Sequence, residues 1–155
     1  MTRKTIMEIK EINTETGDLT PFAALSEDWA HENITHGLCA NSPDDFAGMR
    51  VFGAYEQERL IGYISTTSSR TDRPYSMVPA VGTPCWEIEE LYIIPEMRSR
   101  GIGRTLYRHA EAAAKAEGAE YIFLSTATRD YRRILHFYIE ELGMEFWNAR
   151  LFKRL

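Results

Sequence analysis

One segment, Leu91–Arg104, constrains the fold of this chain more than any other part of the sequence. A strand-forming run ends at a proline, an arginine-bearing turn follows, and Gly101 and Gly103 then open a helix-forming stretch. A helix that begins with glycines presents its first amide groups and the positive end of its dipole to an anion. The segment therefore predicts a strand, a turn and a helix whose start binds a phosphate group.

Two familiar phosphate-binding motifs do not fit this segment. A nucleotide P-loop requires Lys followed by Ser or Thr after its glycines, whereas Gly103 is followed by Arg104. A dinucleotide-binding fold requires Gly-x-Gly-x-x-Gly, but Leu106 occupies the position of the third glycine. With both motifs excluded, the segment presents an arginine-rich turn followed by Gly-x-Gly as its candidate phosphate-binding pattern.

The rest of the chain alternates between strand-like and helix-like runs. We expect strands over 5–12, 50–55, 60–66, 86–94, 121–126 and 144–152, and helices over 19–33, 42–46, 101–118 and 131–142. Residues 56–59 read as the turn of an antiparallel hairpin, 67–84 as a long loop, and 121–126 as a strand buried on both faces. This order predicts an α/β class fold, with a mixed sheet and helices on its faces.

Composition excludes several classes of protein. The net charge of -5 argues against a nucleic-acid binder, which needs a basic face. No apolar run approaches the roughly 18–20 residues of a membrane span, and the N-terminus lacks the apolar middle of a signal peptide. Cys39 and Cys85 form neither a disulfide framework nor a metal cage. We therefore expect a cytoplasmic protein with no metal site and no membrane contact.

The charge is unevenly distributed along the chain. Residues 1–97 contain 7 Lys and Arg against 16 Asp and Glu, a net of -9, whereas residues 98–155 contain 11 against 7, a net of +4. Such a division suggests that one part handles a cationic group and the other an anionic one. Ordinary solvated surface charge is the alternative.

The sequence resembles the GCN5-related N-acetyltransferase (GNAT) superfamily. Its acetyl-CoA motif, Arg or Gln followed by x-x-Gly-x-Gly or Ala, is matched by Arg98–Gly103, and its Phe-Tyr signal near a glycine is matched by Phe137-Tyr138 and Gly143. The resemblance implies one domain over 1–155, with a mixed, mostly antiparallel sheet of six to seven strands and helices on both faces. The chain departs from the family in having four residues, not three, between Tyr138 and Gly143.

The resemblance also implies acetyl-CoA as the co-substrate. Main-chain groups around the motif would bind pyrophosphate and the preceding strand edge would pair with pantetheine, which gives these candidates: Leu91, Tyr92, Ile93, Arg98, Ser99, Arg100, Gly101, Ile102, Gly103 and Arg104. Tyr138 would protonate the leaving thiolate, because a phenol has a pKa near 10 and can donate a hydrogen bond to it. A purely structural role for Tyr138 as a core aromatic is the alternative.

Three glutamates within the predicted strand 86–94 are candidates for the acceptor side. A cationic amine must lose a proton before transfer, and a carboxylate can attract it and take that proton. Glu89 is the first candidate for the base and Glu90 the second. Strict alternation places Glu87 and Glu89 on one face and Glu90 on the other, unless the β-bulge usual in the family redirects one of them. Pairing with arginines or simple solvent exposure is the alternative for all three.

These features predict an N-acetyltransferase that moves an acetyl group to the amine of a small cationic molecule by direct transfer in a ternary complex. A protein or peptide N-acetyltransferase and a non-catalytic acyl-CoA-binding module remain as alternatives. We expect the acceptor to meet residues of 29–41 and 67–84, among them Trp29, Glu32, Asp72 and Tyr75. Homodimers are common in the family, and Phe146-Trp147 could support one, with a core role as the alternative.

Overall fold

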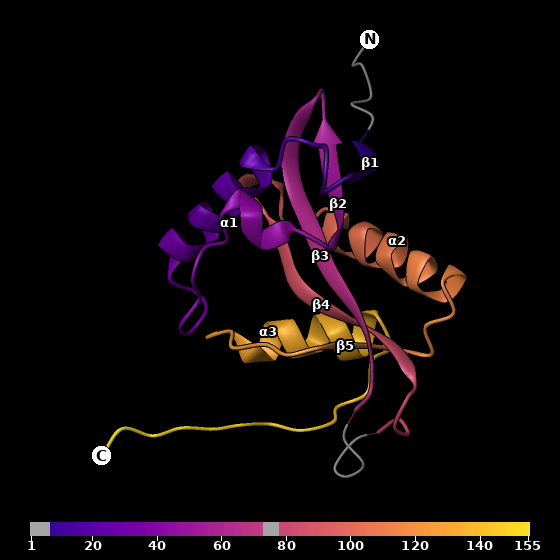
Figure 1. The fold of residues 1–155 in the computed structure, drawn as a ribbon. Coiled ribbons are helices and arrows are strands. Elements are labelled where there is room, and N and C mark those ends of the chain that lie inside the picture. Colours follow the sequence, from indigo (N-terminus) through magenta and orange to yellow (C-terminus); the bar gives the residue numbers. More distant parts are fainter. Residues whose placement is uncertain (1–6, 73–77) are drawn as a thin grey trace.

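The chain forms a mixed sheet of five strands with helices on both faces (Figure 1). A computed structural model describes residues 7–72 and 78–155, so the start of the expected strand 5–12 and Tyr75 lie outside the described residues. The strands are β1 (Met7–Ile12), β2 (Arg50–Glu56), β3 (Arg59–Arg70), β4 (Pro84–Ile93) and β5 (Tyr121–Leu124). The helices are α1 (Thr20–Glu32), α2 (Ile102–Ala116) and α3 (Tyr131–Leu135), with 3-10 turns η1 (Pro43–Phe46) and η2 (Pro95–Met97) and a π-helix η3 (His136–Glu141).

The sheet has the order β1-β2-β3-β4-β5. The first four strands are antiparallel, and β5 runs parallel to β4. The predicted hairpin between β2 and β3 is confirmed: its two turn residues, Gln57 and Glu58, have left-handed φ angles of 49° and 66°. Two such residues match the twist of the flanking strands.

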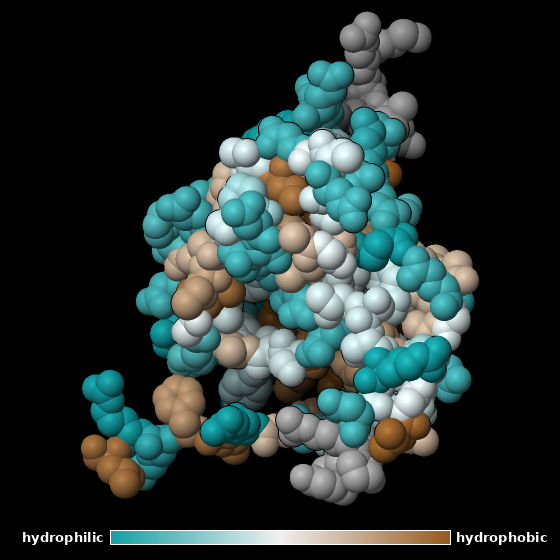
Figure 2. Space-filling model, viewed as in Figure 1, coloured by the Kyte–Doolittle hydropathy of each residue, from teal (hydrophilic) through white to brown (hydrophobic). Residues whose placement is uncertain are grey.

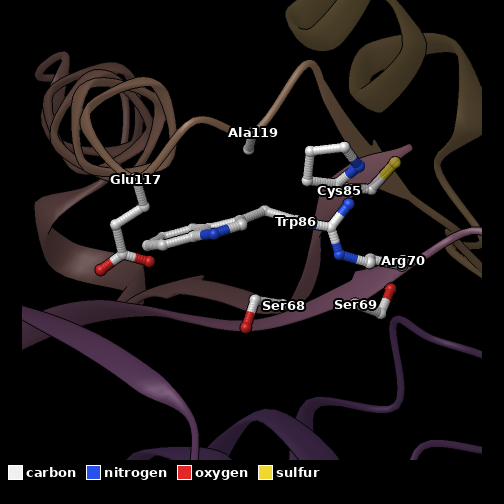
Figure 3. Close-up of a pocket in the computed structure, with 8 residues that line it drawn as sticks. Ser68, Ser69, Arg70, Cys85, Trp86, Glu117 and Ala119 are labelled. Carbon is white, nitrogen blue, oxygen red and sulfur yellow. The ribbon is translucent and has the colours of Figure 1, made fainter. Parts of the chain in front are cut away.

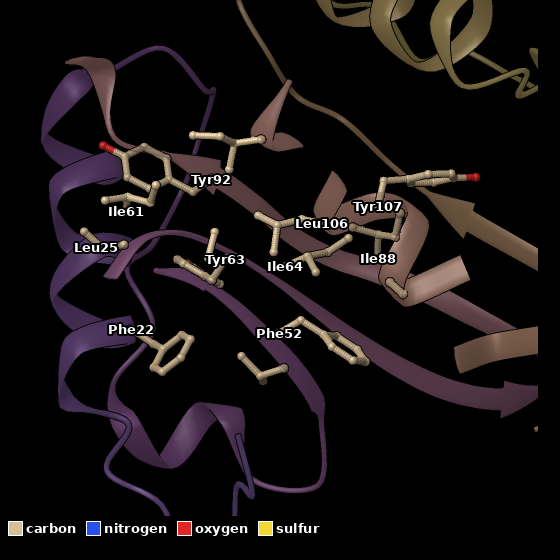
Figure 4. Packing of buried hydrophobic residues seen from close by; sticks show 14 of the residues in the cluster. Phe22, Leu25, Phe52, Ile61, Tyr63, Ile64, Ile88, Tyr92, Leu106 and Tyr107 are labelled. Carbon is tan, nitrogen blue, oxygen red and sulfur yellow. The ribbon is translucent and has the colours of Figure 1, made fainter. Parts of the chain in front are cut away.

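The hydrophobic core lies on both faces of β3 and β4 (Figure 4). On one face, the rings of Phe22 from α1, Phe46 from η1 and Tyr63 from β3 meet edge to face, with centroids 5.8–6.3 Å apart. On the other face, α2 packs Leu106 and its neighbouring buried side chains, which recur every three or four residues along the helix. This packing fixes the start of α2 next to the end of β4.

Several expected elements differ from the structure. Residues 42–46 make only a single 3-10 turn, and the helix expected over 131–142 is divided into α3 and the wider η3. The expected strand over 144–152 is absent among the described residues, and the sheet therefore has five strands, not six or seven. A strand is stabilised by a neighbouring strand, and this segment pairs with none of the described strands. Figure 2 shows the C-terminal end standing clear of the body.

The strand β5 also differs from the expectation of a strand buried on both faces. It ends at Leu124, and its first residue, Tyr121, is 38% exposed. The reason is its place in the sheet, because β5 is the last strand in the order and pairs only with β4 among the described strands. Of the described helices, none is both long and apolar enough to span a bilayer.

Candidate active site

A fork opens in the sheet where β4 and β5 separate. Their last paired residues are Ile88 and Leu124, whereas β4 continues beside β3 to Ile93. The amide of Ile94 donates to the Ile61 carbonyl of β3 over 3.0 Å. Because successive peptide groups of a strand point to opposite edges, the amides of Leu91 and Ile93 face the fork. This edge of β4 can therefore pair with an extended ligand.

The start of α2 follows directly after this strand edge. The turn places Ser99 and Gly101 in the left-handed region, with φ angles of 63° and 79°. Thr105 donates its amide to the Gly101 carbonyl over 3.1 Å and closes the first helical turn. The amides before Thr105 have no intrahelical partner, as at any helix start. With glycine as the cap residue, these amides form a helix start of the kind that suits an anion.

The side chain of Arg98 is directed away from that helix start. Its Nη1 and Nη2 donate to the two carboxylate oxygens of Glu32 over 2.8 and 2.7 Å, and its Nε donates to the Ile93 carbonyl over 2.9 Å. The Tyr92 hydroxyl donates to Glu32 over 2.6 Å, and Trp29 stacks on the Tyr92 ring. Burial would raise the pKa of Glu32, but the hydrogen bonds from Arg98 and Tyr92 outweigh it and lower the pKa. The guanidinium therefore joins α1 to β4, and the Arg98 amide is likewise engaged, donating to the Pro95 carbonyl over 3.3 Å.

The other two arginines of the motif are more exposed. Arg100 donates to the Glu96 carbonyl over 3.2 Å. Arg104 makes a 3.2 Å ion pair with Glu141 of η3 in which its side chain stays 53% exposed. Exposed arginines of this kind can turn toward an incoming phosphate at little cost, because a surface ion pair contributes only about 0–1 kcal/mol.

The expected β-bulge is present, and it lies among the glutamates. Ser65 of β3 pairs with Glu90 and the next residue, Thr66, pairs with Ile88, so Glu89 is the extra residue. Glu87 pairs with Thr67, which shares a face of β3 with Ser65. Glu87 and Glu90 consequently lie on the same face, and the assignment from strict alternation was wrong. A bulge shifts the alternation by one residue.

Glu90 is the buried glutamate of the three, with 6% of its surface exposed. The Ser26 hydroxyl donates to its carboxylate over 3.1 Å, and the Asn41 side-chain amide donates to the other oxygen. Burial raises the pKa of Glu90 despite these hydrogen bonds. The carboxylate thus ties β4 to α1 and to the loop that follows α1.

Glu89 differs from Glu90 because its carboxylate is exposed. The Thr67 hydroxyl donates to it over 2.5 Å. The pKa of the neighbouring Glu87 is raised by burial and by the charge of Glu89. The bulge therefore presents the Glu89 carboxylate to solvent, with the Thr67 hydroxyl as a hydrogen-bond donor to it.

Tyr138 lies in the π-helix η3. The Leu142 amide donates to the Phe137 carbonyl over 3.1 Å, which is the five-residue step of a π-helix. The wide turn accommodates the extra residue between Tyr138 and Gly143, and the helix still ends at a glycine with a φ angle of 75°. Burial next to Tyr107 of α2 raises the pKa of Tyr138.

Contacts between η3 and the first turn of α2 bring Tyr138 to the helix start. A Cβ atom added at Gly103 would lie 3.4 Å from the Phe137 ring, so the glycine is in close contact with η3. The ion pair between Arg104 and Glu141 joins the same two elements. The structure thus gathers the motif 98–104 and the Phe-Tyr signal on one side of β4.

Two hollows lie outside the fork. One, of about 310 Å³, lies at the opposite end of β4 and is lined by Trp86, Cys85, residues of β3 and residues of the turn that follows α2 (Figure 3). Burial raises the pKa of the Cys85 thiol, which disfavours its reactive thiolate form. The other, of about 380 Å³, lies between α1 and η1 and includes Asn41, the partner of Glu90.

The sequence pattern did not reveal several residues of this site. Glu32 was expected near the acceptor, but not as the partner of Arg98, which lies 66 residues further along the chain. Ser26, Asn41 and Thr67 were not expected as partners of the glutamates. Hydroxyl and amide side chains occur on every surface, and no local spacing marks the ones that meet a distant carboxylate.

The sequence matches the family model described as Acetyltransferase (GNAT) family over residues 8–144. The chain therefore belongs to this family. No curated protein matches it significantly.

Solved structures share the fold at low sequence identity. The aminoglycoside N-acetyltransferase AAC(6')-Iy in complex with CoA is 17% identical, with a TM-score of 0.71 over 100% of this chain and 98% of that one. The aminoglycoside acetyltransferase HMB0005 from an uncultured soil metagenomic sample is 14% identical, with a TM-score of 0.70 over 97% and 99%. The ribosomal-protein-alanine N-acetyltransferase from Brucella melitensis biovar Abortus 2308 is 16% identical, with a TM-score of 0.66 over 96% and 99%.

Proposed function

We propose that this protein transfers the acetyl group of acetyl-CoA to the amine of a small cationic molecule. The observation that carries the proposal is the fork after Ile88 and Leu124, which leaves the edge of β4 free beside the open start of α2. The strand edge suits an amide-containing pantetheine arm, and the helix start suits a pyrophosphate. Gly103 in this helix start lies against the Phe137 ring of η3, the neighbour of Tyr138.

Glu89 and Tyr138 supply the two proton-transfer groups of the proposed reaction. Glu89 takes a proton from the cationic amine, directly or through water, and the freed nitrogen forms a bond to the thioester carbonyl carbon. The carbon–sulfur bond breaks, the leaving thiolate takes a proton from Tyr138, and the second proton lost by the acylated nitrogen passes through water to restore the phenol. The raised pKa of Tyr138 keeps the phenol protonated at neutral pH, as a donor requires. Alignment of amine and thioester in one complex supplies much of the rate enhancement.

The charge around β4 supports a cationic acceptor. Glu87 and Glu89 are exposed on this strand, and their neighbour Glu90 is buried. Two of the similar structures are acetyltransferases of aminoglycosides, which agrees with such an acceptor. The similarity to a ribosomal-protein-alanine N-acetyltransferase keeps a peptide N-terminus as the second candidate.

A thiol-release assay tests this function. The full chain is incubated with acetyl-CoA and, in separate reactions, an aminoglycoside, a polyamine and a neutral peptide with a free N-terminus. We expect CoA release with the polycations and little with the peptide. Turnover of the peptide alone would favour protein acetylation. Binding of acetyl-CoA without release for any amine would contradict the enzymatic function.

A further inference from the structure

We infer that contacts through Trp29, Thr35 and Thr128, here the cross-piece, close the far end of the fork and restrict the acceptor to an amine whose nitrogen is carried by a CH₂ group. The inference rests on the proposed function, because it concerns how the amine reaches the thioester of the same site. Without the cross-piece the fork would be open at its far end, since β4 and β5 separate after Ile88 and Leu124.

The first part of the cross-piece joins β4 to α1. Tyr92 lies two residues after Glu90 on β4, so its ring is on the face of the sheet that Glu87 and Glu90 share. Trp29 of α1 stacks on this ring, with centroids 5.5 Å apart and an angle of 20° between the planes. Glu32 accepts a 2.6 Å hydrogen bond from the Tyr92 hydroxyl. The last turn of α1 is therefore fixed against the β4 arm of the fork.

The second part joins α1 to the segment that follows β5. The Trp29 Nε1 donates to the Thr35 hydroxyl over 3.2 Å, and Thr35 pairs antiparallel with Thr128. On either side of this pair, the amides of His36 and Arg129 donate to carbonyls of the facing segment over 2.8 and 2.9 Å. The contacts from β4 through α1 to the segment after β5 are thus continuous.

The cross-piece limits the space inside the fork. Figure 1 shows α1 and the loop after it reaching the chain that leaves β5. The fork is thus bounded by β4, by β5 with the segment after it, and by the cross-piece. An extended pantetheine arm paired with the β4 edge takes up one strand spacing, about 4.8 Å, of the enclosed space. The amine has to reach the thioester through the narrow passage that remains beside this arm.

Charge directs the amine to one end of this passage. Glu87 pairs with Phe123 where β4 and β5 are still joined, and Glu89 is the bulged residue just beyond. Both glutamates are exposed. At the other end, Arg129 carries a positive charge, and its Nη2 donates to the Asn33 side chain over 3.4 Å. An ammonium group is therefore attracted to the glutamates and repelled from the cross-piece.

A branch beside the nitrogen widens the acceptor at the point that must enter the passage. A site limited by size distinguishes one such carbon by about 10–200-fold in kcat/KM. An amine on a CH₂ group enters end-on, whereas a peptide N-terminus bears a side chain on the carbon next to its nitrogen. The cross-piece therefore favours the small cationic acceptor over the peptide.

Thiol release from acetyl-CoA by the full chain tests the inference with two matched amines. They are putrescine and its analogue with a methyl group on the carbon beside each nitrogen. We expect kcat/KM to be about 10-fold or more higher for putrescine. Arg129→Pro removes an amide donor of the cross-piece and should bring this ratio close to one by increasing kcat/KM for the methylated amine. Arg129→Ala loses the same side chain but keeps the amide, so the wild-type ratio should persist.

A second variant keeps the inference testable if Arg129→Pro does not fold. Trp29→Phe retains a ring against Tyr92 and removes the donor to Thr35, so it should also lower the ratio. Thermal unfolding and acetyl-CoA binding check the fold and the donor site of each variant. Hydrogen exchange of the wild type should show protection of the His36 and Arg129 amides, which the cross-piece bonds.

The inference and the proposed function fail in different ways. Equal kcat/KM for the two amines in the wild type, or unprotected amides at His36 and Arg129, would overturn the inference alone. A ratio that stays at its wild-type value in both Arg129→Pro and Trp29→Phe assigns the selectivity to another part of the site. Release of CoA with neither diamine nor any other amine overturns the proposed function, and the selection of an acceptor falls with it.

Discussion

Arg98 and Glu32 form a bidentate ion pair, with distances of 2.8 and 2.7 Å, that joins the end of β4 to the last residue of α1. Both side chains are about one-quarter exposed. The first residue of the acetyl-CoA motif therefore holds the scaffold together through its side chain, while its neighbours in the turn leave their amides free. Arg98 therefore serves the stability of the fold, and the proposed pyrophosphate site lies in the residues that follow it in the same short segment.

Glu32→Gln should destabilise the fold by about 1–2 kcal/mol at pH 7, since one hydrogen bond to a charged group is lost in a partly exposed pair. The folded pKa of Glu32 is lowered, so its contribution is present above the ordinary pKa and is lost as pH falls through the folded pKa. Urea unfolding at neutral and acidic pH measures both effects. Glu27→Gln, on an exposed position of the same helix, is the control. Equal unfolding free energies of the two variants at pH 7 would contradict the prediction.

Glu90→Gln should have the opposite dependence on pH. Burial raises the folded pKa of Glu90, so ionising it weakens the fold as pH rises from the ordinary pKa through the folded one. Glutamine keeps hydrogen-bonding groups for Ser26 and Asn41 without the charge. The Tm of the variant relative to wild type should therefore increase from acidic to neutral pH, as thermal unfolding can measure. If the Tm difference between the variant and wild type stays constant or falls as the pH rises, burial does not raise the folded pKa of Glu90.

Glu89→Gln should lower kcat by about 10²-fold or more, because the amide cannot accept the proton of the amine. Steady-state rates at neutral pH, with the amine found by the thiol-release assay, measure this loss. Glu58→Gln, in the hairpin turn, is the matched control. If Glu90→Gln loses activity in this way and Glu89→Gln does not, the base is the buried glutamate.

Tyr138→Phe should lower kcat by about 10²-fold and change the KM for acetyl-CoA little, because it removes a proton donor and keeps the ring. Tyr121→Phe removes a phenol from an exposed position and serves as the control. Thermal unfolding of both variants checks that the fold persists. An unchanged kcat in Tyr138→Phe would assign this residue to packing alone.

Local patterns allowed much of this fold to be predicted. The order of strands and helices through residue 142, the β2–β3 hairpin and the glycine-opened helix each depend on spacing, turn residues and caps within a short stretch. The β-bulge was expected from the family resemblance, but its position at Glu89 required the pairing of β3 with β4. Once the bulge is placed, the faces of Glu87 and Glu90 follow.

The remaining differences come from partners distant in the sequence. The arginines of the motif were expected to add charge for a phosphate, yet Glu32 engages Arg98 from 66 residues away. The strand expected over 144–152 has suitable residues, but none of the strands that the structure describes pairs with it. The composition of a segment sets its preference for a strand, and only a paired backbone satisfies that preference.

By itself, the sequence determined the strand, turn and helix around Gly101 and the class of ligand they suit, because the amides and dipole of a helix start belong to one continuous segment. The tertiary structure decided which glutamate is buried, where the guanidinium of Arg98 points and how the extra residue before Gly143 fits into a π-helix. Each of these depends on contacts between elements, and side-chain pairing across a core is not encoded in any local spacing.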